Sequence, residues 1–168
     1  MELGKPKVFA RILDQARQEL TTAWENPAHA GYCTVSCPDC LRSYDNRRLH
    51  GALDWRLALD MMDLAAGGSL KTDRWLARGP SQARAFAQST GGWLTAELVD
   101  GLPVLFNKED RKAVILGHPL WRRDEDHYTD QQRHAVDIVT TNTDVNTIEL
   151  SDLYEIDRQP LAVLRYLT

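Results

Sequence analysis

The three cysteines of the chain lie within eight residues, in the order Cys33-x3-Cys37-x2-Cys40. Two thiols separated by two residues can bind one ion from a single tight turn, and a third nearby thiol closes the same site from the preceding loop. A tetrahedral ion such as zinc needs a fourth ligand. Two histidines are candidates, His29 and His50, and a water molecule or a residue of a partner chain are the alternatives. The pattern predicts a structural zinc site.

Other interpretations of these cysteines stay open at this point. They could be small buried side chains, or they could form one disulfide with a spare thiol. An odd number of cysteines without a secretory signal argues against a disulfide framework. A catalytic metal is disfavoured, because no H-E-x-x-H or H-x-E stretch accompanies the cysteines.

Helices are expected on both sides of the cysteines. Apolar residues recur at three- and four-residue steps over residues 7–25, between Pro6 and Asn26-Pro27, which predicts an amphipathic helix. A second helix is expected from Pro38 to about Asp45, because proline suits a first helical turn. A third is expected over residues 53–66, and Gly67-Gly68 would stop it.

The rest of the chain has a strand-rich pattern. Residues 69–92 are expected to bridge two lobes, with a helical turn at 73–77 and a short helix over 82–89 capped by Ser81. Asp100-Gly101 is a hairpin signal between two apolar runs, and residues 113–117 are a continuous apolar run typical of a buried strand. A helix is expected over 131–140, a strand or turn over 148–156, and a last strand or short helix after 158. We therefore expect an α+β fold, with a helical zinc-knuckle lobe at 1–68 and a smaller strand-rich lobe at 93–168.

Composition bounds the class of protein. The chain has 168 residues, of which 43% are hydrophobic and 26% charged, which is ordinary for a globular domain. No 18-residue apolar run and no signal peptide are present, so no membrane contact and a cytoplasmic location are expected. The net charge of -4 gives no global attraction to nucleic acid, so any such contact needs a local basic patch.

Such a patch is a candidate next to the cysteines. Four arginines with phosphate-binding potential surround the predicted knuckle, and Tyr44 lies among them; they are Arg42, Arg47, Arg48 and Arg56. Their alternative role is to form salt bridges with nearby aspartates on a solvated face.

Signals for an enzyme are weak. The sequence has no Walker A stretch and no G-x-S-x-G nucleophile elbow. The acids Glu97, Asp100, Glu109 and Asp110 with Lys112 only faintly match a metal-dependent nuclease core. We therefore expect no enzymatic activity.

The cysteine segment resembles a known module. Cys33-x3-Cys37-x2-Cys40 is followed by Leu-Arg-Ser-Tyr-Asp-Asn at 41–46 and Leu-Asp-Trp-Arg at 53–56. This order is similar to the MrfA-type zinc-binding domain at the C-terminus of DEAD/DEAH-box helicases, which also occurs in anti-phage defence systems. That module has a first cysteine where this chain has Gly31. The resemblance covers about residues 7–66.

The resemblance implies a function through partners. It implies a structural zinc-binding accessory domain, or a C-terminal fragment, that acts with a superfamily 2 helicase or other subunits of the same system. Contact with DNA is part of this expectation. The alternative is an assembly module that binds protein only.

Overall fold

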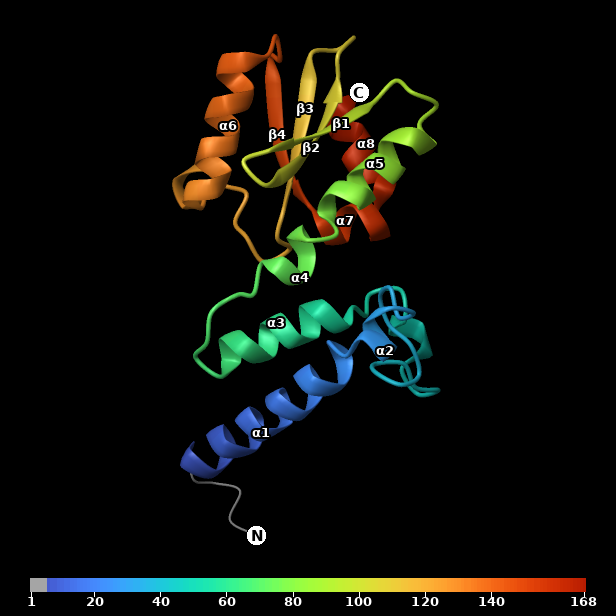
Figure 1. Cartoon of the computed structure of the whole chain (residues 1–168), viewed down its shortest axis with the longest axis vertical. Helices are drawn as coiled ribbons and strands as arrows, with labels where there is room; N and C mark the ends of the chain where they lie inside the picture. The colour runs from blue at the N-terminus through green and yellow to red at the C-terminus, as the bar shows by residue number, and fades with distance from the viewer. Residues whose placement is uncertain (1–5) are drawn as a thin grey trace. The chain divides into compact units, whose positions relative to one another are not determined.

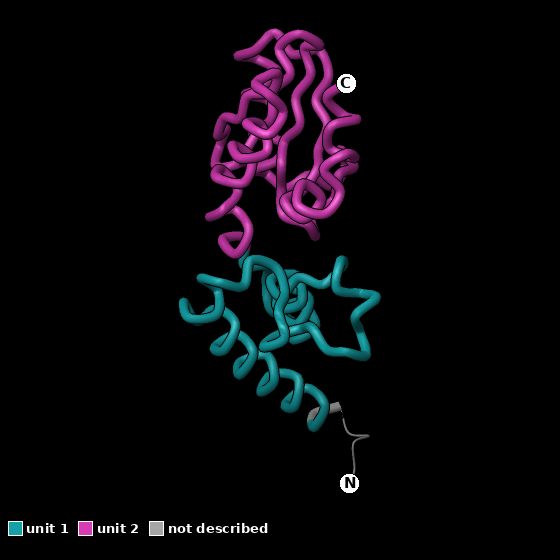
Figure 2. The backbone as a smooth tube through the Cα atoms, turned by 90° about the vertical axis from the view of Figure 1, so that its right-hand side faces the viewer, with its two compact units in different colours: residues 1–71 teal, residues 72–168 magenta. Residues whose placement is uncertain are grey.

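The computed structural model describes residues 6–168 and shows the expected α+β fold (Figure 1). The chain divides into two compact units (Figure 2), which we call unit 1, up to Lys71, and unit 2, from Thr72 to Thr168. Helices make up unit 1, and all four strands belong to unit 2. In the described part of the chain, no helix is both long and apolar enough to span a bilayer.

Unit 1 contains two of the three helices expected around the cysteines. Its elements are α1 (Pro6–Trp24), α2 (Pro27–Ala30), the 3-10 helix η1 (Arg47–Leu49) and α3 (Trp55–Ala65). The side chain of Asp54 accepts a hydrogen bond of 2.8 Å from the Arg56 N–H and so caps the start of α3. Helices α1 and α3 agree with the apolar periodicity of the sequence, and α1 packs against α3.

The helix expected from Pro38 to Asp45 was wrong. Residues 38–41 form a turn, in which the Sγ atom of Cys40 accepts the Cys37 N–H at 3.1 Å. Farther along, the Asn46 amide donates to the Leu41 carbonyl at 2.7 Å and its oxygen accepts the Ser43 N–H at 2.8 Å. The Asn46 side chain takes up the Leu41 carbonyl and the Ser43 N–H, which a helix would pair with backbone groups, so the backbone stays in a tight loop.

Unit 2 begins earlier than the expected strand-rich lobe. Its elements are α4 (Asp73–Leu76), α5 (Gly79–Ser89), β1 (Thr95–Val99), β2 (Leu102–Asn107), β3 (Lys112–Gly117), η2 (Glu125–His127), α6 (Asp130–Asn142), β4 (Thr147–Asp152), α7 (Leu153–Arg158) and α8 (Pro160–Leu167). Residues from Thr72 onward, most of the expected bridge, thus belong to unit 2. Ser81 is not the N-cap of this helix, because α5 already begins at Gly79 and Ser81 lies inside its first turn. No side chain caps the start of α5, and Pro80 is tolerated in the first turn.

The sheet has the strand order β1-β2-β3-β4. The first three strands form an antiparallel meander, and β4 runs parallel to β3 after a crossover through α6. The β1–β2 turn is the predicted hairpin, with φ of 47° at Asp100 and 78° at Gly101, as a two-residue type I′ turn requires.

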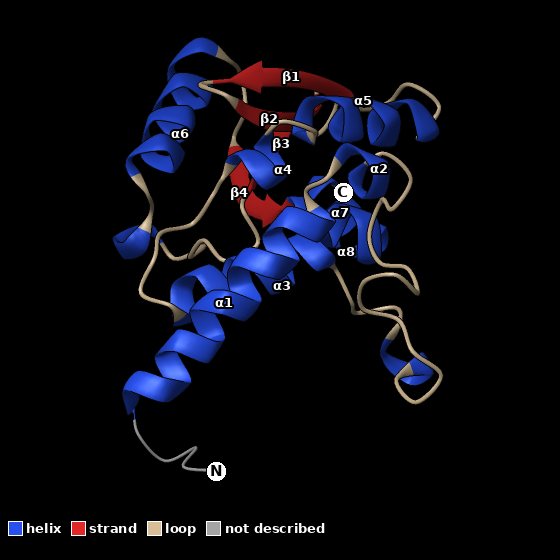
Figure 3. Cartoon of the chain, turned by 60° about the horizontal axis from the view of Figure 1, so that its bottom comes forward, coloured by secondary structure: helices blue, strands red, loops and turns tan. Residues whose placement is uncertain are grey.

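Helices cover both faces of the sheet. Helix α6 lies on one face, and α5, α7 and α8 lie on the other (Figures 1 and 3). All residues of β2 are buried, and so are all but the first of β3, which explains their continuous apolar runs. The main apolar cluster lies between the sheet and α6 and contains Leu102, Val104, Phe106, Ala113, Ile115, Ala135, Val139 and Leu150.

Gly79 allows α5 to approach the sheet. A Cβ atom at this position would lie 2.7 Å from Cγ of Pro103 and 3.1 Å from Cδ1 of Leu153. We predict that Gly79→Ala lowers the free energy of unfolding by about 1–3 kcal/mol through overpacking. Urea denaturation followed by circular dichroism measures this. Gly51→Ala is the matched control, because nothing lies within 4 Å of its Cβ position. Equal stability of the two variants would contradict the packing argument.

Candidate metal centre

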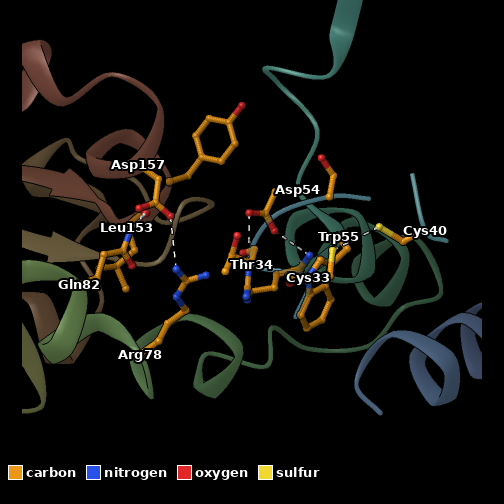
Figure 4. Close-up of polar contacts among 12 residues, drawn as sticks. Cys33, Thr34, Cys40, Asp54, Trp55, Arg78, Gln82, Leu153 and Asp157 are labelled. Atoms are coloured by element: carbon orange, nitrogen blue, oxygen red, sulfur yellow. Dashed lines mark hydrogen bonds and ion pairs between the residues drawn. The ribbon is translucent and has the colours of Figure 1, made fainter. Parts of the chain in front are cut away.

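Four potential metal ligands gather in unit 1. The ligand atoms of His29, Cys33, Cys37 and Cys40 all lie within 4.8 Å of one another. The Sγ atom of Cys40 is 3.8 Å from that of Cys33 and 3.7 Å from that of Cys37, and Nε2 of His29 is 3.6 Å from Cys37 Sγ. Figure 4 shows the contact between Cys33 and Cys40. The group can therefore surround one ion.

His29 is oriented as a metal ligand. Short helix α2, which begins with the Asn26-Pro27 cap, carries the ring into the buried interior of the unit. Its Nδ1 atom lies 2.8 Å from the Trp24 carbonyl oxygen. A carbonyl only accepts, so Nδ1 carries the hydrogen and the lone pair of Nε2 faces the sulfur atoms. A hydrogen bond of this kind, from the nitrogen that does not face the metal, fixes the ring of many metal-binding histidines.

His50, the other candidate, lies outside the group. Its Nε2 atom is 3.0 Å from the Ser43 carbonyl oxygen and 2.9 Å from the side-chain oxygen of Asn46. Both partners only accept, so Nε2 donates into the loop, and His50 does not belong to the group of ligand atoms within 4.8 Å of one another. The structure thus places His29, and not His50, among the cysteines.

The three thiols are free, and their environments differ. The sulfur separations of 3.7 and 3.8 Å far exceed the about 2.05 Å of a disulfide bond. Burial and hydrogen bonds to the other thiols raise the pKa of Cys33 to about 12. Burial also acts to raise the pKa of Cys37, but hydrogen bonds from Tyr32 and Cys33 outweigh it and lower that pKa to about 6.

The Cys40 thiol resists ionisation as well. Burial is also the largest influence on Cys40, whose pKa is raised. Three thiolates packed this closely would repel one another. A divalent cation between them would hold all three in the ionised form.

The same cysteines form part of the apolar core of unit 1. Cys33 and Cys37 pack with Trp24, Trp55 and Leu59. The indole N–H of Trp55 donates to the Cys33 carbonyl at 3.0 Å, and the Trp55 ring meets the His29 ring edge to face at 5.6 Å. Helices α1 and α3 therefore contact the candidate site directly.

The four arginines have different environments. Arg47 and Arg48 are exposed. Arg42 is half-buried, and its Nε donates to Ser36 Oγ at 3.0 Å. Arg56 is only 6% exposed, and its guanidinium donates to the Thr34 carbonyl at 2.7 Å, beside Asp54. Arg56 thus connects the cysteine loop to α3. Because its guanidinium is used in this contact, Arg56 is not available to bind a phosphate.

The acids considered for nuclease chemistry do not converge. Asp100 lies in the β1–β2 turn and pairs with His134 at 3.1 Å. Asp110 lies in the β2–β3 turn, at the other end of strand β2, and accepts a bond from Asn107 at 2.6 Å. Among residues 6–168, the cysteine–histidine group is the one cluster of three or more potential metal-binding side chains found.

Comparisons with known proteins give no relative. No protein-family model, no curated protein and no solved structure matches the chain. What the chain does must therefore be inferred from the site and from the sequence around it.

We predict that His29→Ala weakens metal binding and that His50→Ala does not. Loss of one of four ligands from a closed site removes a bond that the other three cannot replace. Titration of the metal-free protein with Co²⁺, followed by its visible thiolate absorption, reports both affinity and tetrahedral geometry. A tetrahedral spectrum that depends on His50 instead of His29 would refute the ligand set.

Proposed function

We propose that the chain is a structural zinc protein, with His29, Cys33, Cys37 and Cys40 as ligands. The distances between the ligand atoms support this. A tetrahedral zinc with Zn–S bonds of about 2.3 Å and a Zn–N bond of about 2.05 Å needs S···S edges of about 3.8 Å and S···N edges of about 3.6 Å. Three of the six edges in the structure are 3.7 and 3.8 Å between sulfurs and 3.6 Å between sulfur and nitrogen, and the other three are no longer than 4.8 Å.

The proposed zinc is structural because the protein fills all four positions. A catalytic zinc normally keeps one position for water or substrate. Unit 1 also has little else to hold it together. In its described part, the buried apolar residues are Trp24, Cys33, Cys37, Trp55 and Leu59, and two of these five are ligands. Units with so small a core usually need a metal or disulfides to fold.

We further propose that the chain works with a superfamily 2 helicase, as the resembling zinc-binding module does. The motif residues support this, because several of them serve the same knuckle. Asn46 fixes the loop after Cys40, Asp54 caps α3, and Arg56 binds the Thr34 carbonyl between the first two cysteines. In this assignment Arg47 and Arg48 contact nucleic-acid phosphates beside the helicase.

The one departure from the module's pattern has a local explanation. A Cβ atom at Gly31, where the module has its first cysteine, would lie 2.7 Å from the Pro27 carbonyl oxygen. The turn that ends α2 therefore favours glycine here. The same turn presents His29, which supplies the fourth ligand in this proposal.

A second candidate function is an assembly module that contacts proteins only. The exposed apolar side chains of α1, Phe9 at 63% and Ile12 at 46%, favour it. Both candidates are compatible with the same zinc. They differ in whether the chain binds nucleic acid.

We predict about one zinc per chain in the purified protein, measured by elemental analysis. Cys40→Ser should lose this zinc and open unit 1, because three ligands and a small core cannot hold the loop. Limited proteolysis with mass spectrometry should then show rapid cleavage within residues 28–52. Ser43→Ala is the control, since Ser43 joins the loop through its backbone. A folded, protease-resistant protein without metal would refute a structural zinc.

We predict that the tagged chain, expressed in its source organism, recovers a superfamily 2 helicase after nuclease treatment. Mass spectrometry should identify a protein that contains the Walker A motif missing here. Cys37→Ser should recover much less, because the contact surface depends on the knuckle. Equal recovery by both forms indicates non-specific capture, and recovery of other proteins alone favours the assembly module.

A further inference from the structure

The loop at 41–52, between the metal centre and α3, is held in shape by hydrogen bonds among its own residues. Asn46 binds the Leu41 carbonyl and the Ser43 N–H, and His50 closes the loop by donating to Asn46 and to the Ser43 carbonyl. The loop starts directly after Cys40, so its base is held by the proposed zinc site. Its shape is therefore set before any partner arrives.

This ordered loop presents an aromatic ring and two arginines to solvent. Tyr44 is 79% exposed, and the Arg47 guanidinium carbon lies 5.1 Å from the centre of its ring. Arg48 is exposed beside them. Arg47 occupies part of one face of the ring, and at 79% exposure most of the Tyr44 side chain remains open to solvent.

The charge of the loop differs in sign from that of the chain. Residues 41–52 contain three arginines and one aspartate, whereas the whole chain has a net charge of -4. The positive charge is concentrated where the ring is exposed. An anionic partner with flat groups fits this surface better than an apolar peptide does.

We propose that Tyr44, Arg47 and Arg48 form a binding platform for single-stranded nucleic acid, in which a base stacks on the Tyr44 ring and the arginines contact the flanking phosphates. This rests on the proposed nucleic-acid contact and adds its substrate class. Bases in a duplex are already stacked on each other, so an exposed ring can take a base only from a single strand. Stacking also tolerates any base, so little sequence preference is expected.

The test measures binding of the zinc-loaded full chain to a fluorescein-labelled oligothymidine and to a duplex of the same length. Fluorescence anisotropy gives the affinities over a series of salt concentrations. Wild type should prefer the single strand. Tyr44→Phe keeps the ring and should bind as wild type, whereas Tyr44→Leu keeps apolar bulk without a ring and should bind the single strand about tenfold more weakly.

The arginines should act differently from the ring. Arg47→Ala with Arg48→Ala should weaken binding and make its dependence on log salt concentration shallower by about 0.7 for each phosphate that the protein no longer neutralises. Tyr44→Leu should leave that slope nearly unchanged. Arg122→Ala is the matched control, because its side chain is 67% exposed in unit 2. A wild-type slope and affinity are expected for this control.

The outcomes separate the stacking proposal from the function it rests on. Wild-type affinity of Tyr44→Leu with weakened arginine variants would overturn stacking and keep the phosphate contact. Equal binding of duplex and single strand would also overturn it. A zinc-loaded wild type that binds neither would overturn nucleic-acid contact altogether and leave the assembly module, whereas absence of zinc would overturn the metal assignment itself.

Discussion

Unit 1 is built around three sulfur atoms and one imidazole nitrogen that lie within 4.8 Å of one another, in contact with its apolar core. The cluster joins α2 to the turn at 37–40, and the rings of Trp24 and Trp55 pack against it from α1 and α3. Apolar burial is limited to a few side chains, so a cation that holds the thiolates would supply much of the stabilisation that a larger core supplies elsewhere.

Polar side chains that bind backbone groups connect this cluster to the rest of unit 1. Arg56 and the Trp55 indole bind the carbonyls of Thr34 and Cys33, so α3 is attached to the cysteine loop at two consecutive residues. Asn46 does the same for the following loop. Each of these side chains satisfies backbone groups that no helix or strand satisfies, which is how an irregular segment can be ordered. Unit 2 is stabilised in a different way, because its strands β2 and β3 are buried on both faces between helices.

The sequence predicted what is set by local pattern and missed what is set by tertiary partners. Periodicity was enough for α1 and α3, and Asp100-Gly101 was enough for the hairpin. The expected helix at 38–45 failed because the Asn46 side chain takes backbone hydrogen bonds within that stretch, which no periodicity reveals. The choice between His29 and His50 was open because it depends on the hydrogen bonds of each ring. The burial of Arg56 could have been predicted from the sequence. Asp54, two residues earlier, is a typical N-cap residue, which places Arg56 in the first turn of α3, where it is buried.

The cysteine motif contains residues of two kinds, and the difference bears on function. Asn46, Asp54 and Arg56 direct their polar groups inward, and replacing any of them would leave backbone groups unsatisfied. Tyr44, from the same motif, is 79% exposed and buries little surface. Ordering a loop costs conformational entropy, and the exposed Tyr44 ring offsets little of that cost by burial. An ordered loop that exposes an aromatic ring beside two arginines is better explained by a ligand outside the chain than by the stability of the fold.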